Sequence, residues 1–141
     1  MGDGGIATWV AVAAFAAWTA MLCATDVRQR RLPDALTVPP ALAALTACLW
    51  WSALAWGLVW AGFYFFAGRG IGGGDIKLAV PLGIACAAVG GPLGVFAAMG
   101  LAGLFTATAA AALKRRTVAH GPSMLGACWA VFLVLCIYFG D

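Results

Sequence analysis

Three aspartates lie where a long apolar stretch meets a polar segment, and they are the strongest candidates for chemistry. The five acidic residues are all aspartates, two of them near the chain ends (Asp3 and Asp141) and three internal (Asp26, Asp34 and Asp75). An ionisable side chain beside lipid is costly to keep, so it is a functional candidate by default. Two carboxylates that meet in a low-dielectric site share one proton, so one activates a water while the other acts as an acid. We therefore predict that Asp26 and Asp75 form an aspartic peptidase pair.

The residues around Asp75 suggest how such a pair is reached. Gly72, Gly73 and Gly74 come directly before it, and a run of glycines lets the backbone bend and lets a neighbouring helix or an extended substrate approach closely. Lys77 is predicted to anchor at the lipid surface, with contact to substrate or to the carboxylate pair as the alternative.

Asp34 calls for a different interpretation. It follows Pro33 at the start of an apolar segment, where a short acidic side chain commonly caps a helix. We expect a structural N-cap role for it.

The composition requires these residues to be held by membrane helices. Of 141 residues, 65% are hydrophobic and only 9% are charged, and the mean hydropathy is +1.00, far from the average of soluble domains. The length suits a single domain, residues 1–141. The five cysteines form no C-x-x-C pair and lie in apolar stretches, so no metal site, cofactor or disulfide framework is expected.

Segment lengths and helix breakers predict an all-α fold with six transmembrane helices. The apolar segment 35–68 would reach about 51 Å as one helix, which exceeds a hydrocarbon core of about 30 Å, so a turn is expected near Trp50, Trp51 and Ser52. Gly90, Gly91 and Pro92 break the segment 78–113 in the same way. The predicted helices cover about 6–25, 35–50, 53–68, 76–90, 92–113 and 123–140.

The positive charges predict the orientation. All eight Lys and Arg fall in the loops after the first, third and fifth predicted helices, and none falls in the other turns. Because positively charged loops face the cytoplasm, both termini are expected outside it. The charge reports orientation and contact with membrane lipid, so no nucleic-acid partner is expected.

Other interpretations of the same residues remain open at this point. Asp26 could be a helix-end residue paired with Arg30. His120 and Ser123 could suggest a serine peptidase, although both lie in one loop and no G-x-S-x-G motif accompanies them. A small transporter or channel, in which the two aspartates relay protons or bind a cation, is the rival from a different functional class.

Two segments resemble the signature motifs of type IV prepilin peptidases. Residues 26–34 read DVRQRRLPD and residues 72–78 read GGGDIKL, similar to an aspartate followed by a basic stretch and I/L-P-N/D, and then to G-x-G-D-x-K. The resemblance is to the short, six-helix Tad/Cpa-type branch. It implies that Asp26 and Asp75 are the catalytic pair and that Gly72 and Gly74 are the fixed glycines.

The same resemblance implies a substrate and a location. The substrate would be a prepilin or pseudopilin precursor, cut after a short basic leader ending in glycine, beside its own apolar helix. The enzyme would lie in the bacterial inner membrane with its active site on the cytoplasmic side. Larger members also N-methylate the new terminus and carry a cytoplasmic segment with paired cysteines. The loop between Asp26 and Asp34 has no room for that segment, so methyltransferase activity is not expected.

Overall fold

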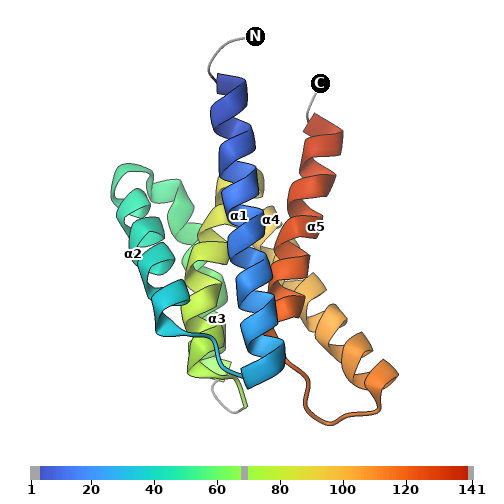
Figure 1. The fold of residues 1–141 in the computed structure, drawn as a ribbon. Helices are drawn as coiled ribbons and strands as arrows, with labels where there is room; N and C mark the ends of the chain where they lie inside the picture. Colours follow the sequence, from blue (N-terminus) through green and yellow to red (C-terminus); the bar gives the residue numbers. More distant parts are fainter. Residues whose placement is uncertain (1–3, 68–69, 140–141) are drawn as a thin grey trace.

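The chain forms a bundle of helices in a computed structural model that describes residues 4–67 and 70–139 (Figure 1). Over these residues the prediction of an all-α fold is confirmed, and no strand is present. The elements, in chain order, are α1 (Gly4–Gln29), α2 (Asp34–Trp50), the 3-10 helix η1 (Ser52–Gly57), α3 (Leu58–Ala67), α4 (Gly73–Leu113) and α5 (Gly121–Phe139).

The two predicted turns within long apolar segments are both present. α2 ends at Trp50 and η1 begins at Ser52. α4 contains a break at Gly91, whose φ of 56° and ψ of −151° lie outside helical values, and Pro92 follows at once. In Figure 1 the part of α4 before the break and the part after it run in opposite directions, so the chain returns to the end of the bundle where α4 began. α4 is therefore two helical segments joined by a sharp bend.

Three predicted boundaries were wrong. α1 continues to Gln29 instead of stopping at residue 25, so Asp26 lies in its last turn and not after it. Arg30 ends the helix by adopting a positive φ of 49°. α4 begins at Gly73 and not at residue 76, because Gly72 is extended and the next two glycines already belong to the first helical turn. The segment predicted as helix 53–68 starts with the 3-10 turns of η1.

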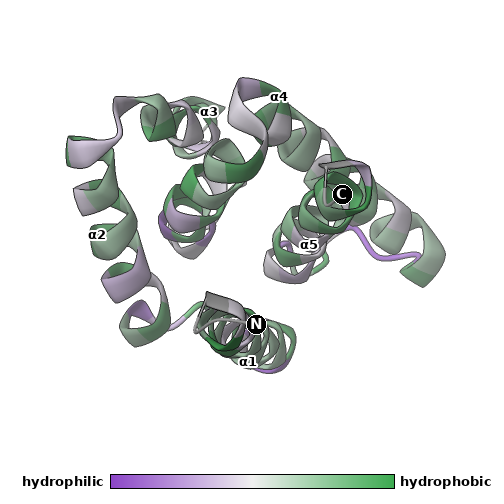
Figure 2. Ribbon diagram, turned by 90° about the horizontal axis from the view of Figure 1, so that it is seen from above, coloured by the Kyte–Doolittle hydropathy of each residue, from purple (hydrophilic) through white to green (hydrophobic). Residues whose placement is uncertain are grey.

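The protein is embedded in a membrane. α1, α4 and α5 are each long and apolar enough to cross a bilayer. Large apolar side chains face outward, including Trp9, Leu49 and Phe66, and Figure 2 shows apolar residues all around the helices. A helix that is apolar on every side is typical of a membrane span. α2 and α3 are shorter than the about 20 residues that a span needs, so the six-span arrangement stays a prediction.

The helix ends that carry positive charge share one end of the bundle. In Figure 1 the end of α1, the start of α2, both ends of α4 and the start of α5 lie together, opposite the start of α1 and the end of α5. Arg69 lies outside the described residues. The compartment that this end faces stays a prediction. The described basic residues at these helix ends and connections are Arg28, Arg30, Arg31, Lys77, Lys114, Arg115 and Arg116.

The core is centred on α4, which contacts α2, η1, α3 and α5. Leu78 and Leu82 of α4 are fully buried, as are Trp60 of α3 and Met124 of α5. η1 crosses α4 very closely, because Gly57 and Gly83 meet backbone to backbone, and a Cβ added at Gly57 would overlap backbone atoms of α4. This crossing fixes the hairpin of α2 and α3 against α4, the helix that carries Asp75 in its first turn.

Replacing Gly57 by alanine tests the crossing. Because the new Cβ meets backbone that cannot rotate away, Gly57→Ala should lower the free energy of unfolding by about 1–3 kcal/mol or more. Thermal unfolding in detergent, followed by tryptophan fluorescence, measures the change. Gly62→Ala is the matched control, since a Cβ at Gly62 meets nothing within 4 Å. Equal stability of the two variants would contradict the close crossing.

Candidate active site

Asp26 and Asp75 line the same cleft at the charged end of the bundle. Asp26 belongs to the last turn of α1 and Asp75 to the first turn of α4, so the two carboxylates come from separate helices whose termini lie at the same end of the bundle. The cleft has a volume of about 530 Å³. The other residues that line it are Gln29, Arg30, Arg31, Leu32, Pro33, Asp34 and the glycines Gly72, Gly73 and Gly74.

Asp26 is buried and bound by a backbone amide. Its side chain is only 6% exposed, and its Oδ2 accepts a hydrogen bond of 2.9 Å from the N–H of Gly121, the first residue of α5. The N-terminal end of a helix carries unpaired N–H groups and a partial positive charge, both of which favour a carboxylate. Asp26 therefore links the end of α1 to the start of α5.

Asp75 occupies a comparable position at a helix start. It is the third residue of α4 and is half-buried, with its own N–H donated to the carbonyl of Gly72 at 3.0 Å. Asp75 also lines a second pocket of about 550 Å³ on its other side. Its carboxyl group thus stands between a polar cleft and a more apolar pocket.

The three glycines before Asp75 do not have equal roles. A Cβ added at Gly74 would lie 3.0 Å from Cβ of Leu32, which is tighter than ordinary packing, whereas one at Gly72 would meet only Oδ2 of Asp75 at 3.7 Å. A Cβ at Gly73 would meet nothing within 4 Å. Gly74 is therefore the glycine that lets the loop after Asp26 pack against the start of α4.

Asp34 does not occupy the N-cap position that the sequence suggested. Pro33 is the N-cap of α2 and makes no side-chain cap, while Asp34 is the first helical residue. Its Oδ1 instead pairs with Nζ of Lys77 at 2.6 Å, which joins the start of α2 to the start of α4. Both side chains are well exposed, at 69% for Asp34 and 45% for Lys77, so the pair contributes little stability. Lys77 thus has a protein partner in addition to its predicted place at the lipid surface.

Within the described residues, the side chains of Asp26 and Arg30 do not form the ion pair that the sequence offered as an alternative. Asp26 accepts from Gly121, and Arg30 donates from Nη1 to Oγ1 of Thr117 at 3.3 Å. His120 likewise bonds to residues other than Ser123. The sequence separation between Asp26 and Gly121 is 95 positions, so no local pattern could have indicated their contact.

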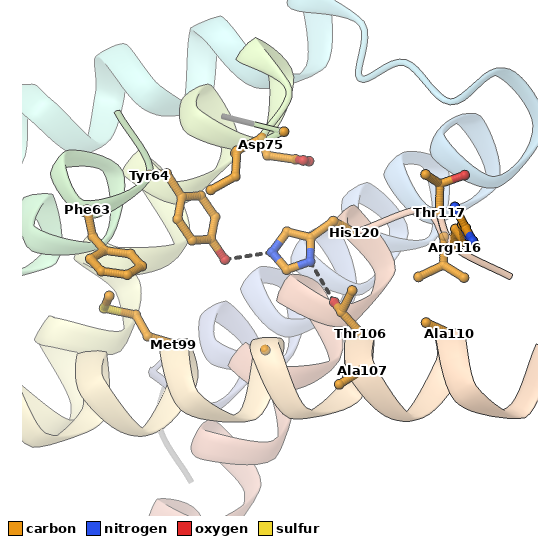
Figure 3. A pocket seen from close by; sticks show the side chains of 14 residues that line it. Phe63, Tyr64, Asp75, Met99, Thr106, Ala107, Ala110, Arg116, Thr117 and His120 are labelled. Carbon is orange, nitrogen blue, oxygen red and sulfur yellow. Dashed lines mark hydrogen bonds between the residues drawn. The ribbon is translucent and has the colours of Figure 1, made fainter. Parts of the chain in front are cut away.

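A chain of hydrogen bonds beside Asp75 was missed at the level of sequence. Nε2 of His120 lies 2.6 Å from the hydroxyl of Tyr64, and Nδ1 lies 2.6 Å from Oγ1 of Thr106 (Figure 3). Burial lowers the pKa of His120 from its usual range, although the charge of Asp26 acts in the opposite direction. His120 is the single histidine of the chain and directly precedes Gly121, and this uniqueness was the only available signal.

Within the described residues, no group of three or more His, Cys, Asp and Glu side chains gathers as metal ligands would. The cysteines are free thiols, and the closest approach that involves two of them is 3.4 Å between the sulfurs of Cys86 and Cys128, in the core. The polar residues that line the cleft of Asp26 and Asp75 are aspartates, arginines and Gln29, and three glycines lie beside them.

These features place the chain in the class of helical membrane proteins that carry an acidic cleft at one end of the bundle. The model of the type IV leader peptidase family matches residues 13–108, which are 96 of the 141 residues and include both Asp26 and Asp75. The chain therefore belongs to the type IV leader peptidase family and is a peptidase. His120 and Gly121 lie beyond the matched segment. Searches of curated proteins and of solved structures found no match.

Replacing each of the two adjacent glycines, Gly73 and Gly74, by alanine tests whether the packing of Gly74 against Leu32 shapes the cleft. Gly74→Ala forces the new Cβ against Leu32, displaces the loop that follows Asp26 and should lower the rate of leader cleavage by about 10-fold or more, since small displacements of catalytic groups are costly. Gly73→Ala, in the same helical turn, should cleave at the wild-type rate. A gel-shift assay on a prepilin-type substrate in membranes measures both. An equal loss of cleavage rate in the two variants would show that the close packing of Gly74 against Leu32 does not explain the effect.

Proposed function

We propose that the protein is an aspartic endopeptidase that removes the leader of prepilin-like precursors of the Tad/Flp type at the cytoplasmic face of the membrane. The observation that carries the proposal is the shared cleft of Asp26 and Asp75, two aspartates brought together from separate helices at the charged end of the bundle. Membership of the leader peptidase family supplies the reaction class, hydrolysis of a peptide bond.

The two carboxylates would divide the chemistry between them. The amide of Gly121 donates to Oδ2 of Asp26, so we assign Asp26 the role of general base. Two like charges in one cleft are unfavourable, so Asp75 holds the shared proton. Asp26 then takes a proton from a water, whose oxygen attacks the carbonyl carbon of the scissile bond. Asp75 donates its proton to the reacting carbonyl oxygen, which gives a tetrahedral gem-diol. Asp26 then passes the proton it took from water to the leaving nitrogen, Asp75 takes back a proton from the gem-diol, and the C–N bond breaks to give the carboxylic acid and the free amine.

The position of the cleft suits a substrate that is itself anchored in lipid. A precursor cut just before its own apolar helix presents the scissile bond at a membrane surface, and the cleft lies at a bundle end. Gly72, where an added Cβ would meet only Oδ2 of Asp75, leaves open space beside that carboxylate, where an extended strand can lie. The arginines at this end would bind acidic lipid headgroups and so hold the cleft at that surface. We expect no methyl transfer, because only residues 27–33 separate Asp26 from Asp34.

Conservative amide substitutions test the pair. Asp26→Asn and Asp75→Asn should each lower leader cleavage at least about 100-fold, because a carboxamide cannot act as a general base or a general acid at neutral pH. The Asn oxygen at residue 26 can still accept from Gly121, so Asp26→Asn should retain the fold. The measurement is the size shift of a candidate prepilin co-expressed in membranes.

Asp34→Asn is the matched control. It removes one charge from the same cleft but changes only an exposed pair with Lys77, so its cleavage should stay near the wild-type level. Full activity of Asp26→Asn or Asp75→Asn would contradict the mechanism. Proton or cation flux in liposomes, without any cleavage by the wild type, would instead support the transporter.

A further inference from the structure

The hydrogen bonds around His120 favour one position for its proton. The hydroxyl of Thr106 donates to the carbonyl of Ala102 at 2.9 Å, so its oxygen is left to accept from Nδ1–H of His120. With the proton on Nδ1, the Nε2 atom is an acceptor and receives the hydroxyl of Tyr64. Every bond in this chain is satisfied by the neutral Nδ1–H form of the imidazole.

The protonated form requires the Tyr64 hydroxyl to change its role. An imidazolium carries N–H on both nitrogens, so the Tyr64 oxygen would have to accept from Nε2, and the hydroxyl proton would lose Nε2 as its partner. Burial favours the neutral form, and the negative charge of Asp26 from α1 opposes it. Among the described residues, the other titratable or charged groups that line the 550 Å³ pocket beside His120 are Tyr64 from α3, Asp75 from the start of α4 and Arg116 from the connection that follows α4.

The backbone of His120 connects this chain of bonds to Asp26. The carbonyl of His120 accepts the N–H of Met124 at 3.1 Å, in the first turn of α5, and the next residue, Gly121, donates its N–H to Asp26. The side chain of His120 is held on α3 and α4 while the adjacent amide holds the carboxylate on α1. Moving the imidazole therefore moves the amide that orients Asp26. Space at this point is tight, since a Cβ on Gly121 would lie 2.6 Å from Oδ2 of Asp26.

We propose that His120 is a positioning residue: as a neutral imidazole held between Tyr64 and Thr106, it sets the Gly121 amide that orients the carboxylate of Asp26. The role of His120 in catalysis, through the orientation of Asp26, rests on the proposed aspartic peptidase mechanism. The tautomer of His120 and its dependence on Tyr64 do not rest on that mechanism.

The first experiment reads the imidazole directly. Because His120 is the only histidine, ¹⁵N-histidine labelling of the whole protein in detergent gives the two nitrogen signals of this one ring. The expected result is a neutral Nδ1–H tautomer that titrates below the ordinary value of about 6.5. An Nε2–H tautomer in the wild type would overturn the proposal.

The Tyr64→Phe variant tests the direction in which the titration midpoint of His120 moves. The Tyr64 hydroxyl donates only to the neutral ring, so its removal destabilises the neutral form and should raise the titration midpoint by roughly half to one pH unit. Tyr138→Phe is the matched control, because Tyr138 is exposed near the far end of α5 and should leave the midpoint unchanged. An unchanged midpoint in Tyr64→Phe would also overturn the proposal.

The pH dependence of leader cleavage then tests the link to Asp26. In the wild type, kcat should fall on the acid side as His120 is protonated, and in Tyr64→Phe this fall should begin at a pH higher by the shift seen in the ¹⁵N titration. His120→Asn, which can still donate to Thr106 but does not titrate, should lower the plateau a few-fold and abolish this limb. A purely structural role would lower kcat at every pH without moving the limb.

The outcomes separate the two proposals. If Asp26→Asn and Asp75→Asn remain active, the aspartic mechanism fails, while the tautomer and its response to Tyr64→Phe still test the geometry. If those variants are inactive but Tyr64→Phe and His120→Asn keep the wild-type pH profile, the mechanism stands and the positioning role of His120 is refuted.

Discussion

The hydrogen bond between Asp26 and the amide of Gly121 is the interaction on which the site depends. A carboxylate that is 6% exposed at the end of an apolar helix loses most of its hydration, and the start of α5 replaces it with an oriented N–H group. The same bond joins α1, which leaves most of its surface to lipid, to the rest of the bundle. Through His120, the neighbouring residue, it is also connected to α3 and α4. The need of the buried Asp26 carboxylate for a hydrogen-bond donor thus brings together α1 and α5, which are distant in sequence.

Much of the fold was predictable because lipid simplifies the physical constraints. Span length and the breakers at Trp51, Gly91 and Pro92 were enough to locate the helices, and the motifs around Asp26 and Asp75 were enough to predict the aspartates that share the cleft. The predicted ends of helices were wrong where continuing the helix competes locally with forming a turn. α1 runs on to Gln29, since a polar sequence at a membrane boundary can continue a helix until a residue such as Arg30 adopts a positive φ.

Contacts between distant residues could not be read from the sequence. Asp34 was expected to cap α2, but a cationic partner 43 positions away, Lys77, lies within reach of its carboxylate. The bonds of His120 to Tyr64 and Thr106 depend on how the second segment of α4 folds back beside α3, and no periodicity encodes that. The motifs along the chain indicated the two aspartates that line one cleft. The three-dimensional packing identified the residues that hold them.

The bend at Gly91 has a consequence for the constraints on the two ends of the molecule. Because α4 folds back there, the cleft and the connections around it gather at one end of the bundle, while the turns at Trp51 and Gly91 lie away from it. No residue of those remote turns is among the described residues that line the cleft. The two ends of the molecule therefore face different constraints, one from the polar groups that it must hold together and the other from the apolar surroundings of its helices.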